Sequence, residues 1–276
     1  MSWLRAFSYA LPLLVLGTAC TLRMQRQERA HPAPTLPPGA AGPVPSQPRV
    51  LVQQPLVYRR AHLDTLVLPA GRVLTVYPAT RVAYEQLPTP PYLLPTPSEE
   101  AEELDLTAEE RKRLRTTGHT VQRTGHALWL RPTAARPIRL LDNPADDYDT
   151  NIAYEYLATI PAIQQWLVAV HLYEGGYFLL IDQRTGRRTE IWSPPSVAPD
   201  GQHFVCGNSD VLAHYEPSGL QVWAIDGPRL RKVWERQTAW GVSAPRWLDS
   251  RNIVFEQDYL ENGDVDTRVV RLTVVP

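Results

Sequence analysis

The chain has 276 residues, of which 43% are hydrophobic and 21% are charged. Its 28 Lys and Arg residues nearly balance its 29 Asp and Glu residues, so the formal net charge is −1. This balance gives no overall basic field of the kind that nucleic-acid binding needs, and we expect no nucleic-acid partner. Two cysteines, Cys20 and Cys206, are too few for a framework of disulfides.

The first segment, residues 1–19, has the three-part order of a bacterial secretory signal. Arg5 precedes an apolar run over residues 6–16, and small residues follow before Cys20. The run is about half the ~20 residues that a transmembrane helix needs, and Pro12 interrupts it. We therefore predict a cleaved signal peptide and an exported protein.

The end of this signal resembles a bacterial lipobox, in which signal peptidase II cuts before a cysteine that carries lipid on its sulfur. The resemblance covers residues 16–20, with Gly17 where the pattern usually has leucine. It implies lipid attachment at Cys20, and hence a membrane partner through the anchor. Thr21, in place of aspartate, favours the outer membrane over another periplasm-facing membrane. The alternative is ordinary cleavage after Ala19, which gives a secreted protein.

Residues 20–48 are rich in proline and have almost no large apolar side chain after Met24. Such a segment cannot bury enough apolar surface to offset the entropy lost on ordering. A Pro-rich chain is extended and semi-rigid, at about 3 Å per residue. We predict a tether that holds a folded domain away from the membrane.

Residues 49–125 are predicted to form a small β-rich segment with one helix. Short apolar runs broken by prolines are typical of short or edge strands. Thr107 with Glu110 three residues later predicts a capping box at the start of the helix, and Gly118 predicts its end. Because the helix is short and charged, we expect it at the surface.

Residues 126–276 hold seven of the eight tryptophans, and we expect the core of the fold there. Large aromatic residues at strand spacing are interpreted as core, Trp223 among them. The alternative is that some of them line a groove for sugar or peptide; the residues concerned are Trp192, Trp223, Trp234, Trp240 and Trp247.

The order strand, tight turn, strand occurs over residues 177–192 and again over residues 221–234. Residues 199–201 (Pro-Asp-Gly) and 248–250 (Leu-Asp-Ser) each precede a further strand. The spacing of equivalent strands brackets the ~40 to 45 residues of a four-stranded propeller blade. This order, over residues 160–275, resembles the WD-like propeller repeats of the TolB translocation protein and its relatives. The resemblance implies a mostly β fold, an incomplete or irregular propeller-like array of antiparallel sheets.

One further hairpin is predicted near the C-terminus. The pair Asn262-Gly263 lies between two apolar runs and is a strong hairpin-turn pattern. The acidic residues Asp264 and Asp266 are assigned to the loop.

The sequence contains none of the short motifs that serve zinc, phosphate, redox or serine chemistry. Residues 241–245 approach the Gly-x-Ser-x-Gly pattern but lack its last glycine. Cys206 is interpreted as a small core residue, and His171 and His203 as structural residues. We therefore predict no catalytic residue, no cofactor and no enzymatic activity.

Asp147, Asp149 and Asn151 have the alternation of a calcium loop. Ile152 replaces the glycine at loop position six, and Ala158 replaces the acid at position twelve. We interpret the segment as an Asp/Asn-rich turn between strands, so these three residues are a metal candidate without a predicted metal.

The leading hypothesis is a cell-envelope lipoprotein whose sheet domain binds or scaffolds an envelope protein or a glycan. It depends on the anchor, the tether and the resemblance to non-catalytic repeats. The other hypothesis is a secreted or periplasmic hydrolase whose site is assembled from separate blades. A cluster such as His171, His203 and Asp200 would supply it.

Overall fold

The structure is a computed structural model, and its described residues are 63–68, 71–90, 92, 106–145 and 147–274. The chain divides into two units, Met1–Leu56 and Val57–Pro276, and all described residues lie in the second. The predicted signal peptide, Cys20 and the predicted tether lie outside the described residues. Within those residues, no helix has the length and apolar character needed to cross a bilayer.

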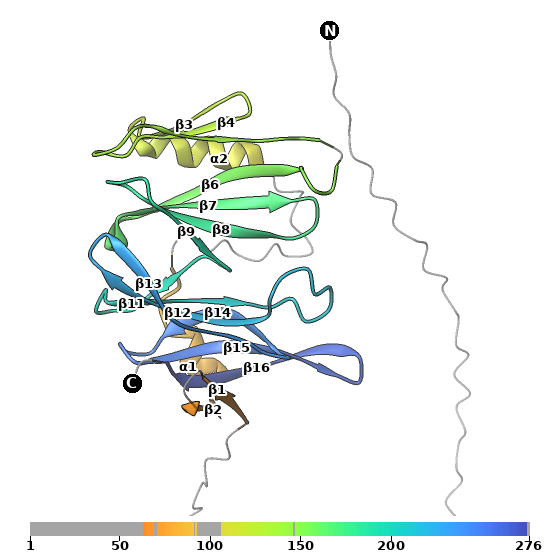
Figure 1. Ribbon diagram of the computed structural model, residues 1–276. Helices are drawn as coiled ribbons and strands as arrows, with labels where there is room; N and C mark the ends of the chain where they lie inside the picture. The colour runs from red at the N-terminus through yellow and green to blue at the C-terminus, as the bar shows by residue number, and fades with distance from the viewer. Residues whose placement is uncertain (1–62, 69–70, 91, 93–105, 146, 275–276) are drawn as a thin grey trace, which may run out of the picture. The chain divides into compact units, whose positions relative to one another are not determined.

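Four antiparallel sheets make up most of the described chain (Figure 1). The β3–β5 sheet contains β3 (Val121–Thr124), β4 (Ala127–Leu130) and β5 (Ile138–Leu141). The β6–β9 sheet contains β6 (Ile152–Ile160), β7 (Gln165–Leu172), β8 (Gly176–Asp182) and β9 (Arg188–Ile191). The β10–β13 sheet contains β10 (Ser196–Val197), β11 (His203–Asn208), β12 (Gly219–Asp226) and β13 (Arg229–Gln237). The β14–β16 sheet contains β14 (Gly241–Trp247), β15 (Asn252–Glu261) and β16 (Asp264–Thr273), extended by β2 (Val73–Pro78) and β1 (Asp64–Val67). The mostly β prediction is therefore confirmed.

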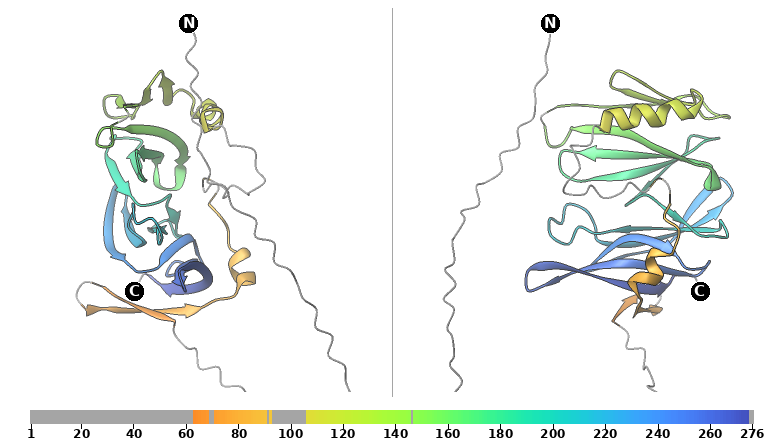
Figure 2. Two further views of the ribbon diagram at one scale, coloured as in Figure 1. Left: turned by 90° about the vertical axis from the view of Figure 1, so that its right-hand side faces the viewer. Right: turned by 180° about the vertical axis from the view of Figure 1, so that it is seen from behind.

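The sheets stack face to face in chain order, as Figures 1 and 2 show. Alternation along β7 is the cause, since successive side chains of a strand point to opposite faces. Trp166 and Val168 join the core against the β3–β5 sheet. Leu167 and Ala169 join the core against the β10–β13 sheet. Burial on both faces explains why β7 is apolar almost without interruption.

The stack is open in the part of the chain that the structure describes. Three cores separate the four sheets, and none of them joins the β3–β5 sheet to the β14–β16 sheet. No closed ring is present among these residues, so four antiparallel sheets are shown and a propeller is not.

The two ends of the described chain meet in one sheet. β2 pairs with β16, with Arg271 opposite Tyr77. The hairpin of β3 and β4 turns at Gly125, where the expected boundary between residues 49–125 and 126–276 falls. Strands on either side of that boundary therefore share a sheet.

Two α-helices, α1 (Arg81–Glu85) and α2 (Leu106–Leu114), and the short helical turn η2 (Arg115–Thr117) precede β3. Gly118 has φ +57° and ends this helical segment as predicted. The capping box is wrong, because α2 begins at Leu106 and Thr107 lies inside it. Glu110 does not cap the helix, since its side chain is buried and accepts a hydrogen bond from the backbone of β6.

The two segments predicted as strand, tight turn and strand are hairpins in the structure. Residues 177–192 and 221–234 form the β8–β9 and β12–β13 hairpins. Asn262 and Gly263 have φ +55° and +94°, as a primed hairpin turn requires. Asp264 and Asp266 are part of β16, and their assignment to the loop is wrong.

Candidate binding groove

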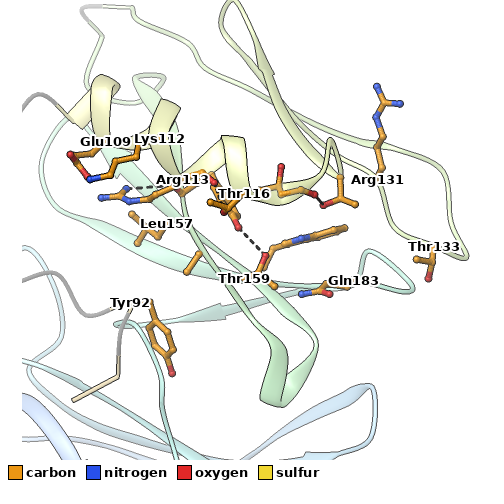
Figure 3. A pocket seen from close by; sticks show the side chains of 15 residues that line it. Tyr92, Glu109, Lys112, Arg113, Thr116, Arg131, Thr133, Leu157, Thr159 and Gln183 are labelled. Atoms are coloured by element: carbon orange, nitrogen blue, oxygen red, sulfur yellow. Dashed lines mark hydrogen bonds between the residues drawn. The ribbon is translucent and has the colours of Figure 1, made fainter. Parts of the chain in front are cut away.

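A pocket of about 670 Å³ lies between α2 and the β6–β9 sheet (Figure 3), and we call it the helix groove. Its volume is within the range of small-molecule sites. It is formed by α2 with η2 and the turn that follows, by β6 and the start of β7, by the loops after β4 and β8, and by Tyr92. Its lining residues are Tyr92, Glu109, Lys112, Arg113, Thr116, Thr117, Thr120, Arg131, Thr133, Tyr156, Leu157, Ala158, Thr159, Trp166 and Gln183.

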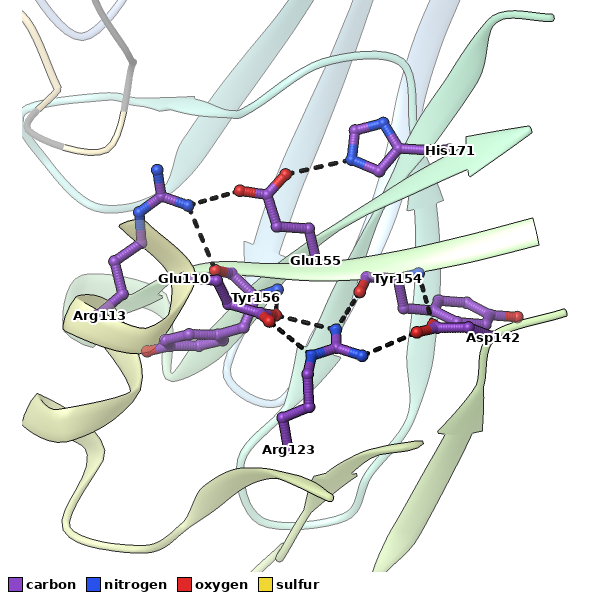
Figure 4. Close-up of polar contacts among 8 residues, drawn as sticks. All are labelled: Glu110, Arg113, Arg123, Asp142, Tyr154, Glu155, Tyr156 and His171. Atoms are coloured by element: carbon purple, nitrogen blue, oxygen red, sulfur yellow. Dashed lines mark hydrogen bonds and ion pairs between the residues drawn. The ribbon is translucent and has the colours of Figure 1, made fainter. Parts of the chain in front are cut away.

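The first wall of the groove is α2, which a buried ionic network holds in place (Figure 4). The Glu110 carboxylate accepts hydrogen bonds from Arg123 Nη2 at 2.9 Å and from the Tyr156 N–H at 2.7 Å. Arg123 Nη1 also donates to Asp142 at 2.8 Å. Charged groups are buried at low cost only when they are paired in this way. The network therefore joins α2, β3 and β6 into one unit.

A second branch of the network reaches the groove itself. Arg113 Nη1 donates to Glu155 at 2.7 Å, and His171 Nε2 lies 3.1 Å from the other oxygen of Glu155. Burial raises the pKa of Glu155, but the hydrogen bonds from His171 and Arg113 outweigh it and lower the pKa below its ordinary value. Glu155 is therefore an anion that fixes Arg113 at the groove wall.

The floor of the groove is an irregular stretch of β6. Tyr156 pairs with Val168 and Ala158 with Leu167, so Leu157 is an extra residue in the ladder. A bulge of this kind turns side chains away from strict alternation. Leu157, Ala158 and Thr159 all line the groove as a result.

Hydroxyl groups on the helical wall face the groove mainly as acceptors. Thr116 donates its proton to the Arg113 carbonyl at 2.7 Å, and Thr120 donates to the Thr117 carbonyl at 2.7 Å. Thr117 donates to the Leu114 carbonyl at 2.8 Å. Each hydroxyl has one proton and two lone pairs, so acceptor capacity remains. On the opposite side, Gln183 donates Nε2 to the backbone, which leaves its amide oxygen as the acceptor.

The groove also carries an excess of cations. Lys112, Arg113 and Arg131 line it, against the single carboxylate of Glu109. Arg113 is paired with Glu155, whereas the guanidinium of Arg131 bonds the neutral amide oxygen of Gln122 at 3.1 Å. The lining can therefore hold an anionic group with charge-assisted hydrogen bonds.

The structure does not bring together the histidine cluster that a hydrolase would need. His171 lies on β7 beside Glu155, and His203 starts β11, opposite Ala224. Asp200 accepts a hydrogen bond from the N–H of Gln202 within its own turn. Among the described residues, the hydrogen-bond partner of His171 is the carboxylate of Glu155 rather than a hydroxyl or thiol group.

The acidic segment before β6 forms a turn. Asp147 accepts from the N–H of Asp149 at 3.2 Å, and its carbonyl accepts from the N–H of Asn151 at 2.9 Å. The Asn151 side chain donates to the Ala145 carbonyl. No group of three or more His, Cys, Asp or Glu residues able to hold a metal occurs in the described ranges.

Of the five tryptophans for which a sugar or peptide groove was the alternative, four are buried as expected and Trp192 is the exception. Trp223, Trp234, Trp240 and Trp247 are each less than 9% exposed, and Trp192 is half-buried. Cys206 is fully buried in the core between the β6–β9 and β10–β13 sheets. None of these five tryptophans lines the helix groove.

Sequence reasoning missed the helix groove because its two main walls, α2 and β6, are separated along the chain and no local pattern brings them together. A pattern was nevertheless available: residues 131–139 and 183–188 are both rich in arginine and contain no acid.

A scan against protein-family models, a search of the curated proteins and a search of the solved structures found no match.

Proposed function

We propose that this protein is an exported lipoprotein of the cell envelope, anchored through Cys20, and that its sheet domain binds an envelope component in the helix groove. The open stack of four sheets serves as an incomplete, propeller-like scaffold for that groove. The observation that carries the proposal is a pocket of about 670 Å³ with convergent polar groups and an apolar floor.

Binding without catalysis is supported by the state of the titratable groups near the groove. Glu110, Glu155 and Asp142 each accept hydrogen bonds from arginine, and these contacts hold the helix. A general base must reach a nucleophile or water at about 3 Å, and these three carboxylates bind arginine side chains of the protein instead.

The anchor is tested by labelling cells with a palmitate analogue, in wild type and in Cys20→Ser. We expect label in the wild type alone. Equal absence of label in both would remove the lipoprotein part of the proposal and leave a secreted protein.

Binding is tested in intact cells with a photocrosslinking amino acid at Thr133, on the rim of the groove, and at Arg229 as an exposed control on the β12–β13 turn. We expect an envelope component to crosslink at Thr133 and not at Arg229. Hydrolysis of esters, glycosides or peptides by the purified protein, abolished in His171→Ala, would contradict binding without catalysis.

A further inference from the structure

Two arginine-rich segments, residues 131–139 and 183–188, meet beside the helix groove. Each is a loop together with the first residues of the strand that follows it, β5 or β9, and we call them the arginine loops. The N–H of Ala134 donates to the carbonyl of Arg184 at 2.8 Å. Gly186 lies so close to residues 131–139 that a Cβ at this position would be 2.7 Å from the side chain of Ile138. The two loops therefore form one packed surface rather than two independent turns.

This surface is positively charged and has no carboxylate of its own. Six exposed arginines belong to it, and none of them forms a salt bridge with a described residue: Arg131, Arg136, Arg139, Arg184, Arg187 and Arg188. The neighbouring Asp182 is 2% exposed and accepts hydrogen bonds from Thr185 at 2.6 Å, so it is bound within the turn. Clustered cations of this kind attract anions from solution.

The arginine loops and the helix groove are continuous. Arg131, Thr133 and Gln183 belong to both, because they line the groove and lie in or beside the loops. Along this path a ligand meets hydroxyl and amide acceptors first and guanidinium donors next. Its chemistry must be complementary, with many hydroxyl donors and with anionic groups beside them.

We propose that the helix groove and the arginine loops bind an anionic saccharide, one that carries carboxylate or phosphate groups. Its hydroxyls donate to Thr116, Thr120 and Gln183, and its anionic groups bind the guanidinium groups of the arginine loops. This inference rests on the proposed function and names the ligand class of the same groove.

A saccharide fits this surface better than the other polyanions of an envelope. An acidic peptide offers one backbone N–H per residue and few hydroxyls, so most acceptors on the helical wall would lose water without a new partner. The face of an anionic bilayer would meet the exposed arginine loops but would leave the groove unfilled.

The test measures binding by titration calorimetry with the mature full-length protein in detergent. The probes are hexagalacturonate, its neutral methyl ester, a phosphorylated maltooligosaccharide, hexaglutamate and vesicles of anionic phospholipid. We expect binding of at least one anionic saccharide that weakens with added salt, and at least tenfold weaker binding of the methyl ester. Salt dependence follows from charge screening.

Variants locate the site. Arg131→Gln is expected to weaken saccharide binding about tenfold, because it removes one charge-assisted hydrogen bond from an exposed guanidinium. Thr116→Val, which removes an acceptor at nearly constant shape, is expected to weaken it severalfold. Arg229→Gln removes the same charge from the exposed start of β13, a position that belongs neither to the groove lining nor to the arginine loops, and should change the affinity less than twofold. Unchanged thermal midpoints show that each variant is folded.

The outcomes separate this inference from the proposed function. Failure of both anionic saccharides to bind, or equal binding of the methyl ester, overturns the saccharide inference. Equal binding of hexaglutamate, or binding of vesicles alone that depends on Arg131, also overturns it. In each of these cases a crosslink at Thr133 in cells would still support binding in the groove.

Discussion

Replacement of Arg123 by methionine tests whether the buried network holds α2 against β6. Arg123 is the common partner of Glu110 and Asp142, and its side chain is 21% exposed while that of Glu110 is 6% exposed. Arg123→Met keeps most of the apolar stem but leaves the Glu110 carboxylate buried without its cation. Removal of one partner of a buried pair costs about 3 to 5 kcal/mol.

The partial exposure of Arg123 places the expected cost at the lower end, about 3 kcal/mol. For a folded unit of this size, about 1 kcal/mol lowers the thermal midpoint by about 2 to 4 °C. We therefore expect a fall of about 6 to 12 °C, measured by calorimetry or circular dichroism. Arg136→Met, an exposed arginine without a salt bridge, is the matched control and should stay within about 0.5 kcal/mol.

A double variant shows whether the loss comes from the orphaned charge. Glu110→Gln added to Arg123→Met keeps an acceptor for the Tyr156 N–H and removes the buried anion. We expect part of the stability to return. A loss below about 1 kcal/mol in Arg123→Met, or no recovery in the double variant, would refute the view that this network fixes the helical wall.

Three other predictions follow from the packing and the charges. Trp223→Ala removes a ring that is 6% exposed and stacks on a neighbouring phenylalanine, so it should cost about 3 to 5 kcal/mol in denaturant unfolding; an unchanged midpoint would place Trp223 at the surface. Gly207→Ala puts a Cβ 2.4 Å from the side chain of Val242, and the overpacking should lower the free energy of unfolding by about 1 to 3 kcal/mol. Unaltered stability would mean that β11 and β14 are further apart than described. The pKa of Glu155 is lowered on folding, so its contribution is complete above the unfolded pKa of about 4.5 and is lost as pH falls through the folded pKa. Wild type should therefore lose more stability than Glu155→Gln between pH 7 and pH 3, and parallel pH profiles would argue against the ion pair.

Local sequence patterns predicted the hairpins, but they could not predict pairings between strands that are far apart in the sequence. Asn262-Gly263 could be interpreted from two residues, because only certain residues adopt the positive φ of that turn. Val270 of β16 pairs with Pro78 of β2, and these two strands lie near opposite ends of the described chain. Nothing in the sequence of either strand specifies its partner. For the same reason, the sequence does not reveal that the β3–β5 sheet and the β14–β16 sheet fail to pack against each other.

The candidate groove was hidden by the ambiguity of charge. Glu110 and Arg123 have the composition of a solvated surface, since most Glu and Arg side chains are exposed. Their burial depends on each other and on Asp142, and the three residues come from separate elements. A single charged residue in a sequence therefore does not reveal whether its partner is water or a buried counterion.

Arginine has two roles around the helix groove, and the difference between them bears on how a ligand is bound. Arg113 and Arg123 are paired with carboxylates and hold the wall of the groove in place before any ligand arrives. The arginines of the neighbouring loops have no such partners among the described residues, yet their backbones are held by hydrogen bonds between the loops. A ligand that binds there gives up little energy to organise the site, because the walls are already packed and only exposed side chains must be ordered. The affinity of the groove should therefore depend on the charge of the ligand and on ionic strength more than on any rearrangement of the sheets.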